Sequence, residues 1–204
     1  YKTGVTEDGK ITAVEVKISA DSGAYVFLSP YVLLYCAVAA PGPYRIDNVK
    51  IDATAIATNN MYTSAFRGFG AAQACVAYEA QMDEVAKTLS LDRFEFRRLN
   101  FMRTGDKTAT GQTVESAIWA DECMTQALEA LGDKPADSGM VKIGRGVATY
   151  QQSYGRITWF HDTSEAWVGI EVDGTVIVRS GVTDIGAGQA SALGQIAAEL
   201  LGVG

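Results

Sequence analysis

The chain has 204 residues, of which 48% are hydrophobic and 20% are charged, a composition typical of a folded globular protein and unlike that of a disordered chain. Its formal net charge of −7 repels a polyanionic backbone, which argues against nucleic acid as a partner. Three cysteines without CxxC spacing and a single histidine, His161, argue against a zinc or iron–sulfur site built from this chain alone.

The two ends of the chain and its apolar runs bear on compartment and completeness. The longest apolar run, residues 31–40, has about half the length that a bilayer crossing needs, so no membrane span is expected. Residues 1–10 contain no apolar segment of the signal-peptide kind, which makes the cytoplasm the expected compartment, with a signal further upstream as the alternative. Because the sequence starts without methionine and stops directly after a helical pattern, we expect an internal fragment of a larger protein.

Strand and helix patterns follow one another in the first part of the chain. A turn at Glu7–Lys10 followed by alternating apolar residues predicts a hairpin. Residues 20–48 predict a short helix or irregular crossover that is stopped by Pro41-Gly42-Pro43. The β-branched residues of 49–58 predict a strand, which leads into the stretch TSAFRGFGAAQA, residues 63–74.

Helical periodicity dominates the middle of the chain. Behind Gly70 the apolar residues recur at i, i+3 and i+4, which predicts a helix of about five turns. Two more helices are predicted within 91–101 and 116–131. The basic residues between Lys87 and Lys107 are interleaved with acidic ones, so we expect a helical face with ion pairs.

A polar break at 132–139 is the predicted linker, and the strand pattern restarts after it. The sequence predicts a strand over 144–149, a hairpin over 165–181 with its turn at Asp173-Gly174, and a helix near the C-terminus. The expected fold class is therefore α+β, with mixed sheets and packed helices.

The same local arrangement occurs twice. At Phe66–Gly70 and at Asp184–Gly188 a β pattern ends in a glycine loop that opens a helix, where unpaired backbone N–H groups and the helix dipole favour a bound anion. Neither loop has the GxGxxG spacing of a dinucleotide site or the Lys-Ser/Thr of a phosphate-binding Walker loop. A nucleotide-binding α/β enzyme is thus the weaker form of the anion-site hypothesis.

Arg67 lies between two glycines and two phenylalanines, and its role is open on spacing alone. A solvated loop charge, a hairpin turn and a close-packed glycine pair are all compatible with this pattern.

The residues downstream of this loop add a resemblance. The order AFRGFG-x-x-Q, then E-x-x-M-D, then R-R-x-N and G-D, all within residues 59–112, resembles the molybdenum-cofactor subunit of the xanthine dehydrogenase and aldehyde oxidase family. Residues 1–25 and 164–189 also resemble segments of that family. The resemblance implies two partial molybdopterin-binding domains, at 1–131 and 141–204, joined by a linker at 132–140.

The resemblance also implies roles for the two glycine loops. Arg67 and the loop main chain would hold the oxygen ligands of the metal, since a cation matches an oxo-anionic cofactor. The implied cofactor-binding residues are Phe66, Arg67, Gly68, Gly70, Ile185, Gly186, Ala187 and Gly188. Many relatives have glutamine where Ala187 stands, so only main-chain contacts are expected there.

Three aromatic residues are implied to contact the substrate. Phe69 corresponds to the aromatic that stacks on a flat substrate, with a loop phenylalanine closing the core as the alternative. Tyr35 occupies the position at which purine-oxidising relatives have an arginine, which makes a purine a less favoured substrate. Tyr154 and Gly155 fall where the family's substrate funnel is lined, with a packed strand-end tyrosine as the alternative.

The family hydroxylates a carbon next to nitrogen or oxygen with oxygen from water, and passes electrons to iron–sulfur clusters and usually FAD. These would belong to partner subunits or domains. The family's catalytic glutamate lies in a G-E-x-P motif that does not occur here, and neither Glu165 nor Glu199 has a sequence context that fits the role. We therefore expect no catalytic residue in this chain and an inactive isolated fragment. The alternative from another class is a noncatalytic α+β binding module whose glycine loops are structural.

Overall fold

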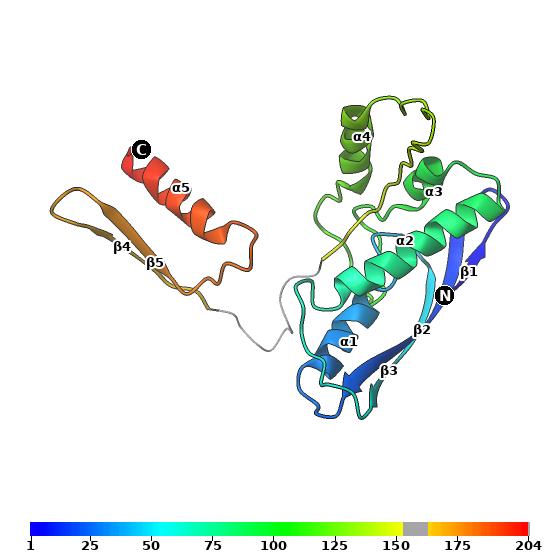
Figure 1. Cartoon of the computed structure of the whole chain (residues 1–204), viewed down its shortest axis with the longest axis horizontal. Coiled ribbons are helices and arrows are strands. Elements are labelled where there is room, and N and C mark those ends of the chain that lie inside the picture. Colours follow the sequence, from blue (N-terminus) through cyan, green and yellow to red (C-terminus); the bar gives the residue numbers. More distant parts are fainter. Residues whose placement is uncertain (153–162, 204) are drawn as a thin grey trace. The chain divides into compact units, whose positions relative to one another are not determined.

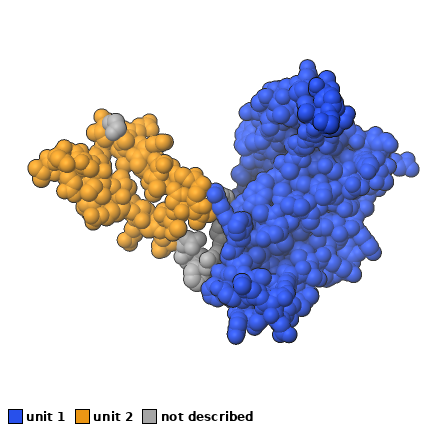
Figure 2. Space-filling view, viewed as in Figure 1, with its two compact units in different colours: residues 1–153 blue, residues 154–204 orange. Residues whose placement is uncertain are grey.

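The computed structural model describes residues 1–152 and 163–203, which form two compact units, 1–153 and 154–204 (Figures 1 and 2). The elements in chain order are β1 (Lys2–Val5), β2 (Ile11–Gly23), α1 (Ser29–Ala39), β3 (Asn48–Ala57), α2 (Ala71–Thr88), α3 (Arg93–Asn100), α4 (Ala120–Leu131), β4 (Ala166–Ile170), β5 (Val176–Ser180) and α5 (Gln189–Leu201). The predicted α+β class with mixed sheets and packed helices is confirmed.

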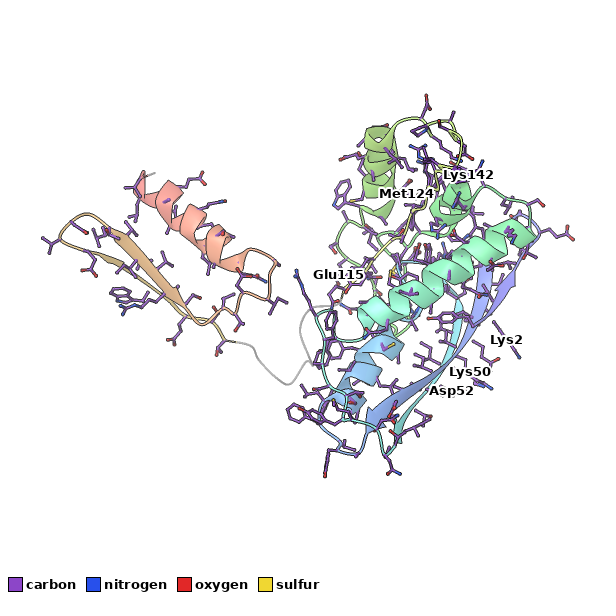
Figure 3. The ribbon with its side chains drawn as sticks, in the orientation of Figure 1. Lys2, Lys50, Asp52, Glu115, Met124 and Lys142 are labelled. Carbon is purple, nitrogen blue, oxygen red and sulfur yellow. The ribbon has the colours of Figure 1, made fainter. Side chains whose placement is uncertain are left out.

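The first unit contains a mixed three-stranded sheet in the order β1-β2-β3. The predicted hairpin pairs β1 antiparallel to β2, and α1 provides the crossover that lets β3 run parallel to β2. On the solvent side Lys50 of β3 lies beside Glu15 of β2, with Nζ 3.1 Å from Oε1, and Lys2 and Asp52 lie in the same charged row (Figure 3).

Helices α1 and α2 cover the other face of this sheet (Figure 1). Alternation along β2 places Val14 and Val16 inward, where they are 4% and 0% exposed. The apolar stripe predicted behind Gly70 meets them, since Ala74, Tyr78 and Met82 of α2 belong to the same core. The core therefore fixes α2 on the sheet.

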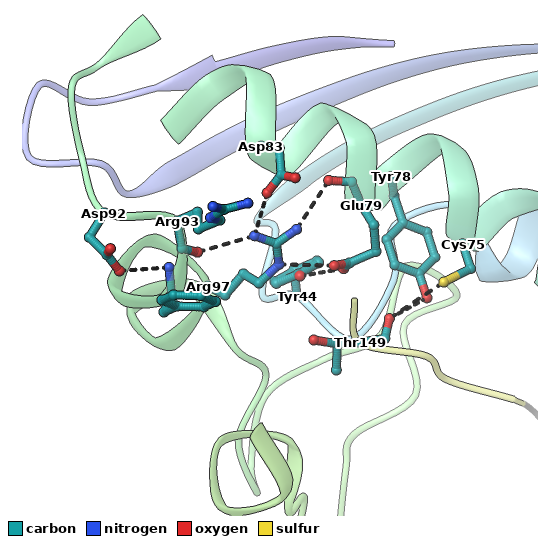
Figure 4. Close-up of polar contacts among 10 residues, drawn as sticks. Tyr44, Cys75, Tyr78, Glu79, Asp83, Asp92, Arg93, Arg97 and Thr149 are labelled. Carbon is teal, nitrogen blue, oxygen red and sulfur yellow. Dashed lines mark hydrogen bonds and ion pairs between the residues drawn. The ribbon is translucent and has the colours of Figure 1, made fainter. Parts of the chain in front are cut away.

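Arg97 of α3 lies at the centre of a buried ionic network (Figure 4). Its side chain is 0% exposed, its Nε donates to Glu79 at 2.9 Å and its Nη1 donates to Asp83 at 2.8 Å. Tyr44 donates its hydroxyl proton to the second oxygen of Glu79 at 2.5 Å. Burial alone would lower the pKa of Arg97, but the bond to Asp83 and the charge of Glu79 raise it. The predicted ion pairs are therefore present, but the principal one lies inside the protein.

The second unit consists of the hairpin β4–β5 and α5. The hairpin was predicted with its turn at Asp173-Gly174, and there Asp173 accepts from the N–H of Thr175 at 2.9 Å. Both its strands and α5 agree with the sequence patterns. None of the helices in the described part of the chain combines the length and apolarity that a membrane crossing needs.

The strand predicted over 144–149 is wrong. Among the described residues this segment pairs with no strand, and the carbonyl of its last residue, Thr149, faces α2 instead. The carbonyl of Thr149 accepts from the hydroxyl of Tyr78 at 2.9 Å, so the segment packs on α2 within the first unit. The division into domains at 1–131 and 141–204, with a linker at 132–140, stays a prediction.

The buried network leads to a stability prediction. Arg97→Ala leaves the carboxylate of Glu79 buried without its cation, so we expect a loss of about 3–5 kcal/mol in the free energy of unfolding, measured by chemical denaturation. Arg98→Ala is the matched control, since Arg98 pairs with Glu95 and Asp121 at a solvent-accessible position and should lose at most about 1 kcal/mol. Equal losses would show that burial of the network contributes nothing.

Candidate functional site

The Phe66–Gly70 loop makes an unusual succession of backbone conformations. Gly68, Phe69 and Gly70 have φ angles of 99°, 48° and 97°, all in the left-handed region. The Phe69 N–H donates to the carbonyl of Phe66 at 2.8 Å, and the Ala71 N–H donates to that of Gly68 at 2.9 Å. A left-handed phenylalanine costs on the order of 1–3 kcal/mol, and such strain is concentrated at functional sites.

Gly70 fixes this loop against α1. A Cβ atom at Gly70 would lie 2.3 Å from the carbonyl oxygen of Val32 and 2.9 Å from the backbone nitrogen of Cys36. No side chain larger than hydrogen fits between the loop and the helix. One reason for a glycine here is therefore close packing, one of the roles that the sequence left open, and the start of α2 is attached to α1.

Tyr35 and Phe69, two of the predicted substrate residues, lie together. Their ring centroids are 5.2 Å apart with an interplanar angle of 81°, an edge-to-face contact. Both rings are half-buried. The contact supports the strained backbone of Phe69 from α1, and it makes these two residues parts of one surface.

The N-terminus of α2 is suited to an anion. No side chain caps this end, and its first turn contains no acidic residue. Arg67, which is exposed, adds a positive charge where the helix dipole is already positive, a placement that favours a negative partner. Phe66 beside it is 73% exposed. These residues fit an oxo-anionic cofactor.

The Asp184–Gly188 loop differs in its electrostatics. The Asp184 carboxylate accepts from the N–H groups of Gly186 at 2.8 Å, Gly188 at 3.3 Å and Ala190 at 3.2 Å. These backbone bonds, with that of Gly186 first, hold the pKa of Asp184 below its usual value. The aspartate takes the place of an external anion, which differs from the expectation of an anion site in both loops.

The second loop nevertheless offers an accessible main chain. A Cβ at Gly188 would meet nothing within 4 Å, and Ile185 is 57% exposed. A flat ligand could approach this backbone directly. Contacts from Ile185, Gly186, Ala187 and Gly188 to a cofactor stay predictions.

The first unit contains a cavity of about 460 Å³ that the sequence did not predict, lined by residues from 117–127 and 147–151. Tyr150 connects it to the glycine loop, since a Cβ at Gly68 would lie 3.3 Å from the Tyr150 hydroxyl. The Thr149 Oγ1 is buried without a hydrogen-bond partner in the described part of the chain. Sequence periodicity could not reveal this cavity. One of its walls includes residues 147–149, which the alternation pattern assigned to a strand.

Other residues of interest make no further site. Tyr154, Gly155 and His161 lie outside the described residues. Within 1–152 and 163–203, no group of three or more histidine, cysteine or acidic residues could hold a metal ion.

The fold is of the α+β class, and comparisons with known proteins give the family. Two family models, both described as molybdopterin cofactor-binding domain, match residues 1–101 and 122–204. The chain belongs to the molybdopterin cofactor-binding domains of the molybdenum hydroxylase family, to which xanthine dehydrogenase and aldehyde oxidase belong.

Relatives of known name agree. The chain is 43% identical over 128 residues to the large molybdopterin subunit of nicotinate dehydrogenase from Eubacterium barkeri, covering 63% of this chain and 30% of that protein. It is 30% identical over 214 residues to xanthine dehydrogenase from Dictyostelium discoideum, covering 100% of this chain and 16% of that protein. The crystal structure of aldehyde oxidoreductase from Desulfovibrio desulfuricans superposes with a TM-score of 0.65 at 34% identity, covering 84% of this chain and 19% of that chain. The chain thus spans less than a third of each of these relatives.

The close packing at Gly70 leads to a second prediction. Gly70→Ala introduces a left-handed alanine and a clash with Val32, so we expect its free energy of unfolding to fall by about 1–3 kcal/mol more than that of Gly105→Ala. Gly105 has a similar φ of 93° but open space around its Cβ position, so its substitution isolates the backbone cost. Equal losses in chemical denaturation would contradict the contact with α1.

The Asp184 bonds lead to a third prediction. A carboxyl group with a lowered folded pKa stabilises its loop above its unfolded pKa, and this contribution is lost as pH falls through the folded value. The amide proton shifts of Gly186 and Gly188, followed by NMR, should therefore titrate below the ordinary aspartate pKa of about 3.9.

Asp184→Ala should abolish this titration, whereas the Asp52→Ala control on β3 should leave it unchanged. A midpoint at or above the ordinary value would contradict the hydrogen bonds.

Proposed function

We propose that the chain is the part of a molybdenum hydroxylase that holds the molybdopterin cofactor, in an enzyme that hydroxylates an aldehyde or an N-heteroaromatic carbon with oxygen from water. The proposal depends chiefly on the exposed Arg67 at an N-terminus of α2 without a side-chain cap, in a chain that two molybdopterin-binding models match. When bound, the cofactor supplies the two-electron oxidation of the substrate carbon.

The Phe66–Gly70 loop provides the charge and the backbone of the site. Arg67 neutralises oxygen ligands of the metal with its planar guanidinium, and the main chain of Gly68 allows close approach. Because Gly70 is packed on α1, this loop is positioned before the cofactor binds, so binding requires little ordering.

Phe69 and Tyr35 orient the substrate. The pair presents an aromatic surface suited to a flat ring or a small aldehyde. Tyr35 has no cation to grip a polar purine, so an uncharged N-heterocycle or an aldehyde fits better, and the aldehyde agrees with the name of one relative. Tyr154 is assigned to the substrate funnel by resemblance alone.

The proton acceptor and the electron acceptors belong elsewhere. We assign the catalytic glutamate to a part of the parent protein outside these 204 residues, and iron–sulfur clusters and FAD to partner subunits or domains. The nicotinate dehydrogenase relative is itself named as one subunit. The cytoplasm is the proposed compartment.

A noncatalytic binding module is the second candidate. The Asp184 carboxylate already accepts the backbone N–H groups of the second glycine loop, as expected for a loop with a purely structural role. Molybdenum and pterin analysis of the parent protein, expressed with active cofactor synthesis, separates the two. The enzyme requires about one molybdenum per protein, and its absence would leave the binding module.

Arg67 gives the sharpest test within the chain. Arg67→Ala in the parent enzyme should lower both molybdenum content and kcat/KM by at least about tenfold, because a charge-assisted contact is lost. Arg67→Lys should have molybdenum content and kcat/KM between those of the parent enzyme and of Arg67→Ala, since lysine keeps the charge but lacks the planar guanidinium. The Arg98→Ala control removes an arginine that pairs with Glu95 and Asp121 and should keep both properties. Equal behaviour of Arg67→Ala and Arg98→Ala would return Arg67 to a solvated loop charge.

A further inference from the structure

We propose that Thr63 is a positioning residue, which pins the upstream end of the Arg67 loop to α1 and to the end of β2. Its effect on the cofactor rests on the function proposed above, but the pin itself does not.

Thr63 makes polar contacts through its nitrogen and both of its oxygens, although the residue is exposed. Its N–H donates to the carbonyl of Ser22 at 3.3 Å, and its hydroxyl donates to the carbonyl of Asp21 at 2.7 Å. The hydroxyl of Ser29 donates to the Thr63 carbonyl at 2.6 Å and lies 2.9 Å from Oγ1 of Thr63. Ser29 and Ser22 are only 6% and 2% exposed, so two of the three partners lie in the protein interior, whereas Asp21 is exposed.

The two ends of the loop are attached to the same helix. Ser29 is the first residue of α1, and Val32 and Cys36, which contact Gly70, lie further along that helix. We call the segment 64–69 the strap, because Thr63 before it and Gly70 after it both contact α1. Arg67 and Phe69 lie between these two anchors. Loss of either anchor would give the strap the freedom of an ordinary loop.

Asp21 holds the chain that approaches Thr63. Its Oδ1 accepts from the hydroxyl of Thr58 at 2.6 Å and from the N–H of Gly23 at 2.8 Å, and its Oδ2 accepts from the side-chain amide of Asn60 at 2.5 Å. Gly23 also approaches this chain closely, since a Cβ there would lie 2.3 Å from the carbonyl oxygen of Met61. The path from β3 to Thr63 is thus defined by the end of β2.

The hydroxyl of Thr63 can be removed without a change in side-chain shape, because valine has nearly the same shape as threonine. In the full-length protein, Thr63→Val and Ser29→Ala should each raise the amide hydrogen exchange of Phe69, whose N–H donates to the carbonyl of Phe66 within the strap, by about five- to tenfold, the effect of one lost hydrogen bond. Thr63→Ser, which keeps the hydroxyl, should restore the parent rate. Thr54→Val, on an exposed threonine of β3, should leave it unchanged.

The same variants test the consequence for the proposed function. Thr63→Val should lower molybdenum content and kcat/KM, and Thr63→Ser should rescue both. Unchanged exchange at Phe69 in Thr63→Val and Ser29→Ala overturns the pin, and so does an equal rise throughout β2 and α2, since that is global loosening. Raised exchange with unchanged molybdenum content and kcat/KM overturns the positioning role. If the parent protein contains no molybdenum, the proposed function fails, and the exchange rates alone decide the pin.

Discussion

The contact between Gly70 and α1 is the constraint on which the site depends. The sheet positions α1, and the space beside Val32 of α1 admits only a glycine. Gly70 occupies this space, so α2 begins directly after it. The loop before it accordingly turns through three left-handed residues, and Phe69 accepts a strained backbone that the ring of Tyr35 supports. The packing of Gly70 therefore helps to position the loop that contains Arg67.

Two loops with the same sequence pattern have different electrostatics. The N-terminus of α2 has neither a side-chain cap nor a first-turn acid, so its dipole and Arg67 favour a negative ligand. At the start of α5 the carboxylate of Asp184 already accepts the backbone protons. A glycine loop that opens a helix is thus only permissive for an anion, and the neighbouring acid decides whether the donors are available.

Much of the fold follows from periodicity, because the hairpin, β3, α2, α5 and the β4–β5 hairpin form where apolar residues recur at strand or helix spacing. The strand at 144–149 failed for a physical reason: alternation describes an extended chain but does not supply a strand to pair with. The burial of Arg97 could not be read from a charged helical face, since its partners Glu79 and Asp83 come from another helix, α2. The anchors of Thr63 lie 34 and 42 residues away along the chain, beyond any local pattern. The Arg67 loop itself was found from its motif.

We propose above all that the Phe66–Gly70 loop is a wall of the molybdenum site. An anomalous difference map at the molybdenum edge, from crystals of the cofactor-loaded parent protein, tests it most directly because it locates the metal without reference to activity. We expect a single strong peak next to this loop, with the Arg67 guanidinium directed at the ligands of the metal. A peak that has no contact with residues 66–70 would contradict it.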